Sequence, residues 1–395
     1  MDDKYNFSLR KLKMKKYHLI KSLKVRPFFK AESFVIHKHY LIFIIISFVI
    51  IFVYTCPSIY NSICFYPFNS SKSLCHFYIY NRTYPITNPV RLANGISYKI
   101  AIISDLDKRS KDSRNTNLWY SIMKTGHLLW VHESNEILVT WDEQDIILSS
   151  SLSMQGRGME FSELVTFDGR LLTFDDRTGI VYSIDKDQIY PWVILMDGNG
   201  KNVKGFKSEW AAVKNDQLYV GSMGKEWTTS SGEWENNNPF WIKVISPQGE
   251  VRSINWSNNY KKLRHAINID FPGYMIHESG LWSDVHNSWF FLPRRCSTHK
   301  YNETLDEIRS CNVLLRADEN FSNIRVINIG AVTPTKGFSS FKFLPGSHEN
   351  IIISLKSEEY QNRMATYIMG FTVDGDIVMP ELKITSEKFE GFEFV

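Results

Sequence analysis

Short apolar runs separated by turn residues dominate the chain from about residue 97 to its end. Runs such as LVTF, LLTF, WAAV and WFFL are rich in β-branched and aromatic residues, and Gly, Asn and Asp stand between them. This alternation predicts β-strands joined by tight turns. Apart from residues 116–126, no long stretch keeps the helical period of about 3.6 residues. The pattern therefore predicts an all-β domain.

One pattern recurs along this domain: a carboxylate or serine, an apolar strand, a turn, a second apolar strand and a charged cluster. Four copies begin at Glu163, Glu209, Glu278 and Ser339. A fifth copy is split between the two ends of the domain, where Glu390 begins GFEFV and the segment KIAII (99–103) supplies the returning strand. Because joining the first and last segments removes exposed strand edges, the repeat predicts a five-bladed β-propeller.

Hairpin geometry predicts where the repeated carboxylates meet. The first strand of a hairpin starts on the same face on which its second strand ends. Glu163, Glu209, Glu278 and Glu390 should therefore converge at one mouth of the central channel. Carboxylates this close either take up protons or bind a cation, and a roomy all-oxygen site favours Ca²⁺ over Zn²⁺ or Mg²⁺.

Charged residues at the strand ends should surround this ion. The acids and cations at these positions are Asp105, Asp107, Asp175, Asp176, Lys108, Arg177, Lys225, Arg294 and Arg295. Together with a cation, such residues suit an anionic, phosphorylated substrate, because they neutralise charge and orient water. Charged strand ends are otherwise solvated, and Trp227 can either pack in the core or stack on a base.

The N-terminal quarter has a different character. Residues 40–56 form an uncharged apolar run of 17 residues, and residues 1–39 hold 11 Lys and Arg against 3 Asp and Glu. An apolar run of this length predicts a single transmembrane signal anchor, and the basic flank predicts a cytoplasmic tail. Residues 57–90 are read as a lumenal stalk, and residues 91–395 as the propeller domain. The chain is thus predicted to be a single-pass type II membrane protein.

The sequons and the cysteines agree with that compartment, and the charge argues against one class of partner. The whole chain carries +4, so the chain after residue 39 carries −4, which argues against nucleic-acid binding. Sequons stand at Asn69, Asn81, Asn255, Asn302 and Asn320. Five cysteines lack metal-site spacing, and Cys296–Cys311 and Cys64–Cys75 are plausible disulfides that leave Cys56 over.

Ten segments from about Ile100 to Val395 form a set of motifs: MEFSELV, DDRTGIVY, KGFKSEW, VGSMGKEWTT, PGYMIHES, WFFLPRR, GFSSFKF, LKSEE, YIMGFT and FEGFEF. Together they resemble the calcium-dependent apyrase family of soluble calcium-activated nucleotidases and insect salivary apyrases. The resemblance implies a five-bladed propeller with a central Ca²⁺ that hydrolyses nucleoside di- and triphosphates.

Carried over by motif, the resemblance implies a set of site residues. The implied calcium ligands are Ser162, Glu163, Glu209, Glu278, Ser339 and Glu390. The implied catalytic residues near the phosphates are Asp105, Asp107, Asp176, Arg177 and Arg294, and the expected substrate-binding residues are Lys108, Asp175, Lys225, Trp227 and Arg295. Which acid acts on water stays open at this point.

The resemblance and the anchor together predict a nucleoside diphosphatase of the endoplasmic reticulum or Golgi lumen that supports glycosylation. A cell-surface form, a form secreted after cleavage, and a homodimer are further expectations. Two alternatives use the same fold: a propeller glycosidase with two opposed carboxylates, and a non-catalytic binding propeller stabilised by calcium.

Overall fold

The structure is a computed structural model and describes residues 78–395. Several predicted features lie outside the described residues: the basic tail, the span at 40–56, stalk residues 57–77, Asn69, Cys56, Cys64 and Cys75. Within residues 78–395, no helix has the length and apolar character needed to cross a membrane.

Four sheets are each built from four antiparallel strands that are consecutive along the chain, apart from one inserted hairpin. The strands of each sheet are given from the central axis outward. The first sheet has β6 (Phe161–Phe167), β7 (Arg170–Asp175), β8 (Ile180–Asp185) and β9 (Gln188–Ile194), and the second has β10 (Trp210–Lys214), β11 (Gln217–Gly221), β14 (Trp241–Ile245) and β15 (Val251–Asn255). The third sheet has β16 (Tyr274–Ser283), β17 (Ser288–Ser297), β18 (Val313–Asp318) and β19 (Ile324–Asn328), and the fourth has β20 (Lys336–Phe343), β21 (Ile351–Tyr360), β22 (Arg363–Thr372) and β23 (Ile377–Thr385). The inserted hairpin consists of β12 (Trp227–Thr228) and β13 (Trp234–Asn236).

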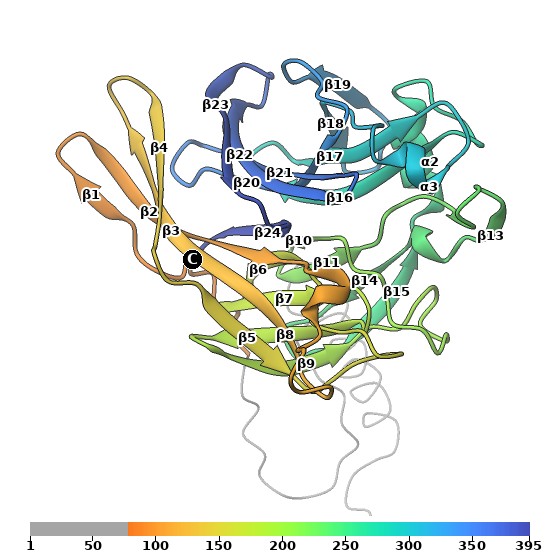
Figure 1. The fold of residues 1–395 in the computed structure, drawn as a ribbon. Coiled ribbons are helices and arrows are strands. Elements are labelled where there is room, and N and C mark those ends of the chain that lie inside the picture. Colours follow the sequence, from red (N-terminus) through yellow and green to blue (C-terminus); the bar gives the residue numbers. More distant parts are fainter. Residues whose placement is uncertain (1–77) are drawn as a thin grey trace, which may run out of the picture. The chain divides into compact units, whose positions relative to one another are not determined.

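The fifth sheet joins the two ends of the domain. Its strands are β24 (Phe389–Phe394), β2 (Gly95–Ser104), β3 (Trp119–Val131), β4 (Glu136–Trp141), β5 (Ile146–Ser150) and β1 (Val90–Leu92). Strand β24 lies beside β2 (Figure 1). In this antiparallel pair, Phe394 lies opposite Ile100. The innermost strands contact one another in the closed order β6, β10, β16, β20, β24 and back to β6. The structure is therefore a five-bladed β-propeller, and the predicted split blade is confirmed.

Five apolar cores hold the ring together, one between each pair of neighbouring blades. The cores contain, in order around the ring, Leu172 with Val220, Trp210 with Trp289, Phe290 with Phe338, Ile353 with Phe392, and Ile103 with Leu164. Each core is filled by side chains from facing sheets, which follows from the strand alternation seen in the sequence. Burial of apolar area between blades thus fixes the ring and, with it, the positions of the innermost strands.

Two segments differ from the period read in the sequence. Residues 119–131 form β3, although 116–126 have a helical period, because β3 pairs with β2, β4 and β5. The helix α2 (Ser257–His265) has the polar sequence SNNYKKLRH and buries Tyr260 and Leu263 in the core between β10 and β16. A shorter helix, α3 (Glu303–Asp306), follows β17. Tertiary pairing overrides local propensity in both regions.

The predicted disulfide between Cys296 and Cys311 is confirmed. It ties the end of β17 to the segment that precedes β18, because Cys296 lies in β17 and Cys311 two residues before Val313. Cys296 directly follows Arg294 and Arg295 in the chain. It therefore fixes the strand that carries two of the predicted site residues.

Residues 78–86 run across the mouth of the channel opposite the predicted site. There, Asn81 donates its backbone N–H to Asp168 (2.9 Å), and Arg82 pairs with Asp216 (2.5 Å). A cavity of about 580 Å³ opens beneath this N-terminal segment, lined by one or more residues of every innermost strand. Residues 78–90, which were predicted to belong to the stalk, therefore include a segment that packs on the propeller.

Replacing Tyr84 by phenylalanine should destabilise the propeller by about 1–2 kcal/mol, because a buried carboxylate loses a donor. Tyr84 Oη donates to Glu393 Oε1 (2.9 Å), and the other donors to this carboxylate are the backbone N–H groups of Thr166 and Phe394. Urea unfolding measures the change. The exposed Tyr190 is the control, and equal effects of the two Tyr→Phe changes would contradict the contact.

Candidate active site

A break in strand pairing marks the predicted calcium ligands on the innermost strands. The strand register shifts at Ser162 and Glu163 in β6, at Glu278 in β16, at Ser339 in β20 and at Glu390 in β24. The residue Glu209 directly precedes β10, and its N–H donates to the carbonyl of Gly221, which also faces Trp210. A bulge bends the strand and redirects side chains, so β6, β16, β20 and β24 can turn these residues differently from their regular neighbours.

Three of the four axial glutamates (Glu163, Glu209, Glu278 and Glu390) are buried, and each contacts a lysine or arginine. Lys207 Nζ lies 2.7 Å from Glu209, Lys342 Nζ lies 3.1 Å from Glu163, and Arg294 contacts both Glu278 and Glu390. Burial raises the pKa of Glu209 to about 8 and that of Glu163 to about 7, despite these cations. The carboxylates are therefore costly to ionise without further positive charge.

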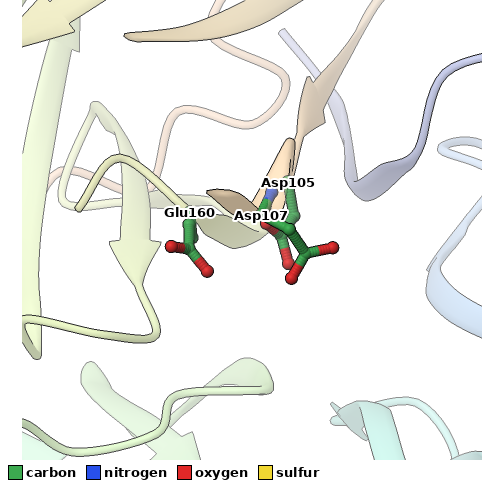
Figure 2. Close-up of side chains that lie close together, drawn as sticks. All are labelled: Asp105, Asp107 and Glu160. Atoms are coloured by element: carbon green, nitrogen blue, oxygen red, sulfur yellow. The ribbon is translucent and has the colours of Figure 1, made fainter. Parts of the chain in front are cut away.

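A second group of acids lies at the rim of the same mouth. Oxygen atoms of the rim acids Asp105, Asp107 and Glu160 all lie within 4.8 Å of one another (Figure 2). Asp105 follows β2, Asp107 begins a 3₁₀ turn (Asp107–Ser110), and Glu160 directly precedes β6. Two blades therefore supply this group, as expected from the strand ends at one face.

The rim acids carry their own counter-ions. Arg157 contacts Glu160 and Asp107, and Arg177 Nε lies 2.8 Å from Glu160. Lys388 Nζ lies 2.9 Å from Asp105 and 3.1 Å from Asp107. Burial raises the pKa of Asp105, but Lys388 outweighs burial and holds it below its ordinary value. Burial raises the pKa of Glu160.

Three axial glutamates and the rim groups form one connected network, whereas the fourth axial glutamate, Glu163, pairs with Lys342 outside it. Its five cations are Arg157, Arg177, Lys207, Arg294 and Lys388, and its eight carboxylates are Asp105, Asp107, Glu160, Asp176, Glu209, Glu278, Glu359 and Glu390. All five blades contribute, Glu359 being the contribution of β21. If every group is ionised, negative charge is in excess, so the site can accept a further cation.

The donor set fits Ca²⁺. Carboxylate and hydroxyl oxygens surround the axis, and Ca²⁺ takes six to eight such oxygens in flexible geometry. The hydroxyl of Ser339 is fully buried and has no hydrogen-bond partner among residues 78–395. The Ser162 hydroxyl donates to the carbonyl of Phe174 (3.3 Å), so this residue would offer its own carbonyl oxygen instead. An axial cation would give the Ser339 hydroxyl a partner.

Several predicted substrate-binding residues lie apart from this network. Asp175 is fully buried, and its carboxylate accepts the backbone N–H groups of Met159, Arg177 and Thr178. Lys108 is exposed. The three backbone hydrogen bonds indicate that Asp175 stabilises the turn that follows β7.

Lys225 and Trp227 also contact residues outside the network. Lys225 Nζ donates to the carbonyl of Glu226 (2.7 Å) and to Thr228 (3.0 Å), and it lies over the Tyr301 ring. Burial lowers the pKa of Lys225 to about 8. The Trp227 ring lies beneath Lys204.

The guanidinium of Arg295 is buried, and its nearest carboxylate is Asp306 (3.8 Å). Arg295 Nη1 has no hydrogen-bond partner among residues 78–395. The structure thus separates the adjacent arginines, with Arg294 in the network and Arg295 beside it.

Sequence reasoning did not single out several members of the network: Arg157, Glu160, Lys207, Glu359 and Lys388. Lys207 and Lys388 carried a readable signal, because each stands two residues before an axial glutamate in the pattern K-x-E. In extended chain, residues two apart lie on the same side. Glu160 and Arg157 lie outside the repeat, so no spacing rule reaches them.

Replacing Asp175 by asparagine should change the pH dependence of stability. Burial raises the pKa of Asp175 from 3.8 to about 7, so between these values the folded state holds a proton that the unfolded state has lost. The stability that this proton contributes is complete below the unfolded pKa and is lost as pH rises through the folded pKa. The variant has no such loss, and it should gain about 4 kcal/mol relative to the wild type between pH 4 and pH 8.

Urea unfolding of both proteins at several pH values measures this difference. A change at the exposed Asp187, to asparagine, serves as the control and should show no pH-dependent difference. A constant offset between the Asp175 variant and the wild type across this range would contradict the raised pKa.

The fold and site define a class: a five-bladed propeller with carboxylates at its axis and a mixed rim of acids, lysines and arginines. The family model described as Apyrase matches residues 106–395, and the chain belongs to the apyrase family. It is 50% identical over 316 residues to soluble calcium-activated nucleotidase 1 of Rattus norvegicus, covering 80% of this chain and 78% of that protein. It is 48% identical over 317 residues to an apyrase of Cimex lectularius, covering 80% and 87%.

A third relative, Apyrase apy-1 of Caenorhabditis elegans, is 40% identical over 301 residues, with 75% of this chain and 84% of that protein covered. Among solved structures, the β-propeller domain of Nup133 from Vanderwaltozyma polyspora matches with a TM-score of 0.30 at 10% identity, over 67% of this chain and 73% of that chain. This structural likeness is too low to carry an argument. The family resemblance read from the sequence motifs is confirmed.

Proposed function

We propose that the protein is a nucleotide phosphohydrolase that cleaves the terminal phosphoanhydride bond of nucleoside di- and triphosphates in a calcium-dependent reaction. The observation that carries this proposal is the connected network of carboxylates, lysines and arginines from all five blades at one mouth. The names of the relatives, apyrase and calcium-activated nucleotidase, support the same chemistry. A neutral sugar would need few cations, so the network favours a phosphorylated substrate over a glycan.

Ser162, Glu163, Glu209, Glu278, Ser339 and Glu390 would hold the calcium ion. When bound, Ca²⁺ supplies positive charge against phosphate oxygens, which lowers the cost of gathering negative charge at the reacting phosphorus. Mg²⁺ is a poorer match because it requires octahedral coordination at shorter metal–oxygen distances and usually retains several water ligands.

Side chains at this mouth would position the attacking water and stabilise the charge that develops on the phosphate. Water attacks the terminal phosphorus, the bond from that phosphorus to the bridging oxygen breaks, and the water proton passes to a carboxylate. Arg177 and Arg294 would stabilise the charge that develops on the phosphoryl oxygens. The products are a nucleotide with one phosphate fewer and inorganic phosphate.

Asp107 is the carboxylate that best fits the water-orienting role. Its side chain is 33% exposed, whereas those of Asp105 and Glu160 are 6% and 0% exposed. Its backbone has a φ of 50°, which an aspartate rarely adopts outside functional or turn positions. Asp107 also lies between Arg157 and Lys388, so its carboxylate is held where substrate and solvent can meet it.

The test is phosphate release by the purified full-length protein from UDP, GDP, ADP, ATP and UMP, with Ca²⁺, with Mg²⁺ and with a chelator. Calcium-dependent release from the di- and triphosphates, but not from UMP, is the expected result. Release of reducing sugar from a glycan without phosphate release would favour the glycosidase, and a folded protein with neither activity would favour a binding propeller.

The location is a second part of the proposal. The basic tail and the apolar run at 40–56 support a type II membrane protein of the endoplasmic reticulum or Golgi, with the propeller in the lumen. Removal of nucleoside diphosphates released during glycosylation would be its use there. Protease protection of the propeller in intact microsomes tests this orientation, and digestion of the propeller without detergent would contradict it.

A further inference from the structure

Two lysines in the site share one sequence pattern and one set of contacts. Lys207 precedes the axial residue Glu209 by two positions, and Lys388 precedes Glu390 by two positions. The other axial positions have no lysine at this spacing: Phe161, Ile276 and Gly337 stand there. The pattern K-x-E is thus particular to the blades led by β10 and β24.

Each lysine joins an axial glutamate to an aspartate at the rim. Lys207 Nζ lies 2.7 Å from Glu209 and 2.5 Å from Asp176. Lys388 Nζ lies 3.4 Å from Glu390 and 2.9 Å from Asp105. Both lysine side chains are mostly buried, at 23% and 6% exposure, so water screens these charges only in part.

We propose that Lys207 and Lys388 are positioning residues that set the calcium affinity of the axial site. This inference rests on the proposed function, because it takes the axial glutamates as calcium ligands. An ammonium group beside a ligand carboxylate repels a divalent cation and competes for the same oxygens. Each lysine therefore weakens calcium binding and at the same time holds a rim aspartate in place.

A third lysine provides the comparison. Lys214 lies at the other end of β10, also largely buried, and pairs with Glu319 (2.6 Å) instead of an axial glutamate. Its removal changes the net charge of the protein as much as removal of Lys207 does. Only a charge beside the ligands should change calcium affinity strongly, since Coulomb energy falls with distance and screening.

The experiment is calorimetric titration of the full-length protein with CaCl₂ at pH 8.5 in the absence of nucleotide. Lys207→Gln and Lys388→Gln should each bind Ca²⁺ about tenfold more tightly than the wild type, since each removes a neighbouring positive charge. Lys207→Arg keeps the charge and should stay close to the wild-type Kd, as should Lys214→Gln. Thermal unfolding with and without CaCl₂ should show a larger calcium-induced rise in Tm for both glutamine variants.

The possible results distinguish an error in the proposed calcium site from an error in the role given to the two lysines. If the wild type binds no Ca²⁺, the calcium part of the proposed function is wrong and this inference falls with it. If the wild type binds Ca²⁺ and the folded glutamine variants bind it equally well or more weakly, the inference alone is wrong. The two lysines lie in different blades, so one variant suffices for the test if the other does not fold.

Discussion

Replacing Asp107 by asparagine is expected to lower kcat by about 10²- to 10⁴-fold, the usual contribution of a positioned acid or base. The variant loses the carboxylate that is proposed to orient water and accept its proton. Asparagine has nearly the same shape and tolerates positive φ, so the backbone at 50° should be kept. Calcium titration and thermal unfolding should therefore stay close to wild type while phosphate release falls.

A matched control exists on the opposite face. Asp216 also has a positive φ, of 56°, and pairs with a basic residue, Arg82. Asp216→Asn repeats the same chemical change in the same backbone conformation, away from the network, and should leave turnover unchanged. If Asp107→Asn kept more than about a tenth of the wild-type kcat, Asp107 would not be the acid that acts on water.

Replacing Arg294 by lysine is expected to lower kcat by about 10²- to 10³-fold, a loss typical of removing one transition-state donor. The guanidinium contacts the carboxylates of Glu278, Glu359 and Glu390, which belong to β16, β21 and β24. A lysine keeps the charge but has a single nitrogen and no planar fork, so it cannot bridge three carboxylates at once. The variant should fold, because the lysine keeps the positive charge and Lys388 also contacts Glu359 and Glu390.

Steady-state phosphate release over a range of UDP concentrations measures this effect. The control is Arg325→Lys, where an exposed arginine pairs with Asp374 (3.1 Å) and the change should have no measurable effect. An unchanged kcat in Arg294→Lys, with a raised KM alone, would mean that Arg294 binds substrate equally in the ground and transition states.

The repeat in the sequence was sufficient for the architecture. Five copies of strand, turn and strand, with the fifth divided between KIAII and GFEFV, could only close their edges by pairing β2 with β24. Propensity was less reliable away from the repeat. Residues 119–131 form a strand although residues 116–126 have a helical period, and polar α2 forms because Tyr260 and Leu263 pack in a core between two blades.

The sequence predicted correctly which mouth of the channel carries the charged residues, but it predicted the individual side-chain contacts less well. Strand ends predicted that Asp105, Asp176 and Arg294 would come together, and the structure brings them into one network. Asp175 differs from Asp176 by one position, yet it turns inward and accepts backbone N–H groups. Successive residues of a strand face opposite sides, but turn geometry at its end decides which of them reaches the mouth.

The sequence by itself determined the five blades, the closure of the ring and the face on which the charged residues gather. These features follow from local alternation and from spacing, which a chain carries before it folds. The tertiary structure alone decided which lysine or arginine meets which carboxylate, and it added Glu160, Lys207 and Lys388 to the site. Those contacts join residues far apart in the chain, and their distances depend on interblade packing that no local pattern encodes.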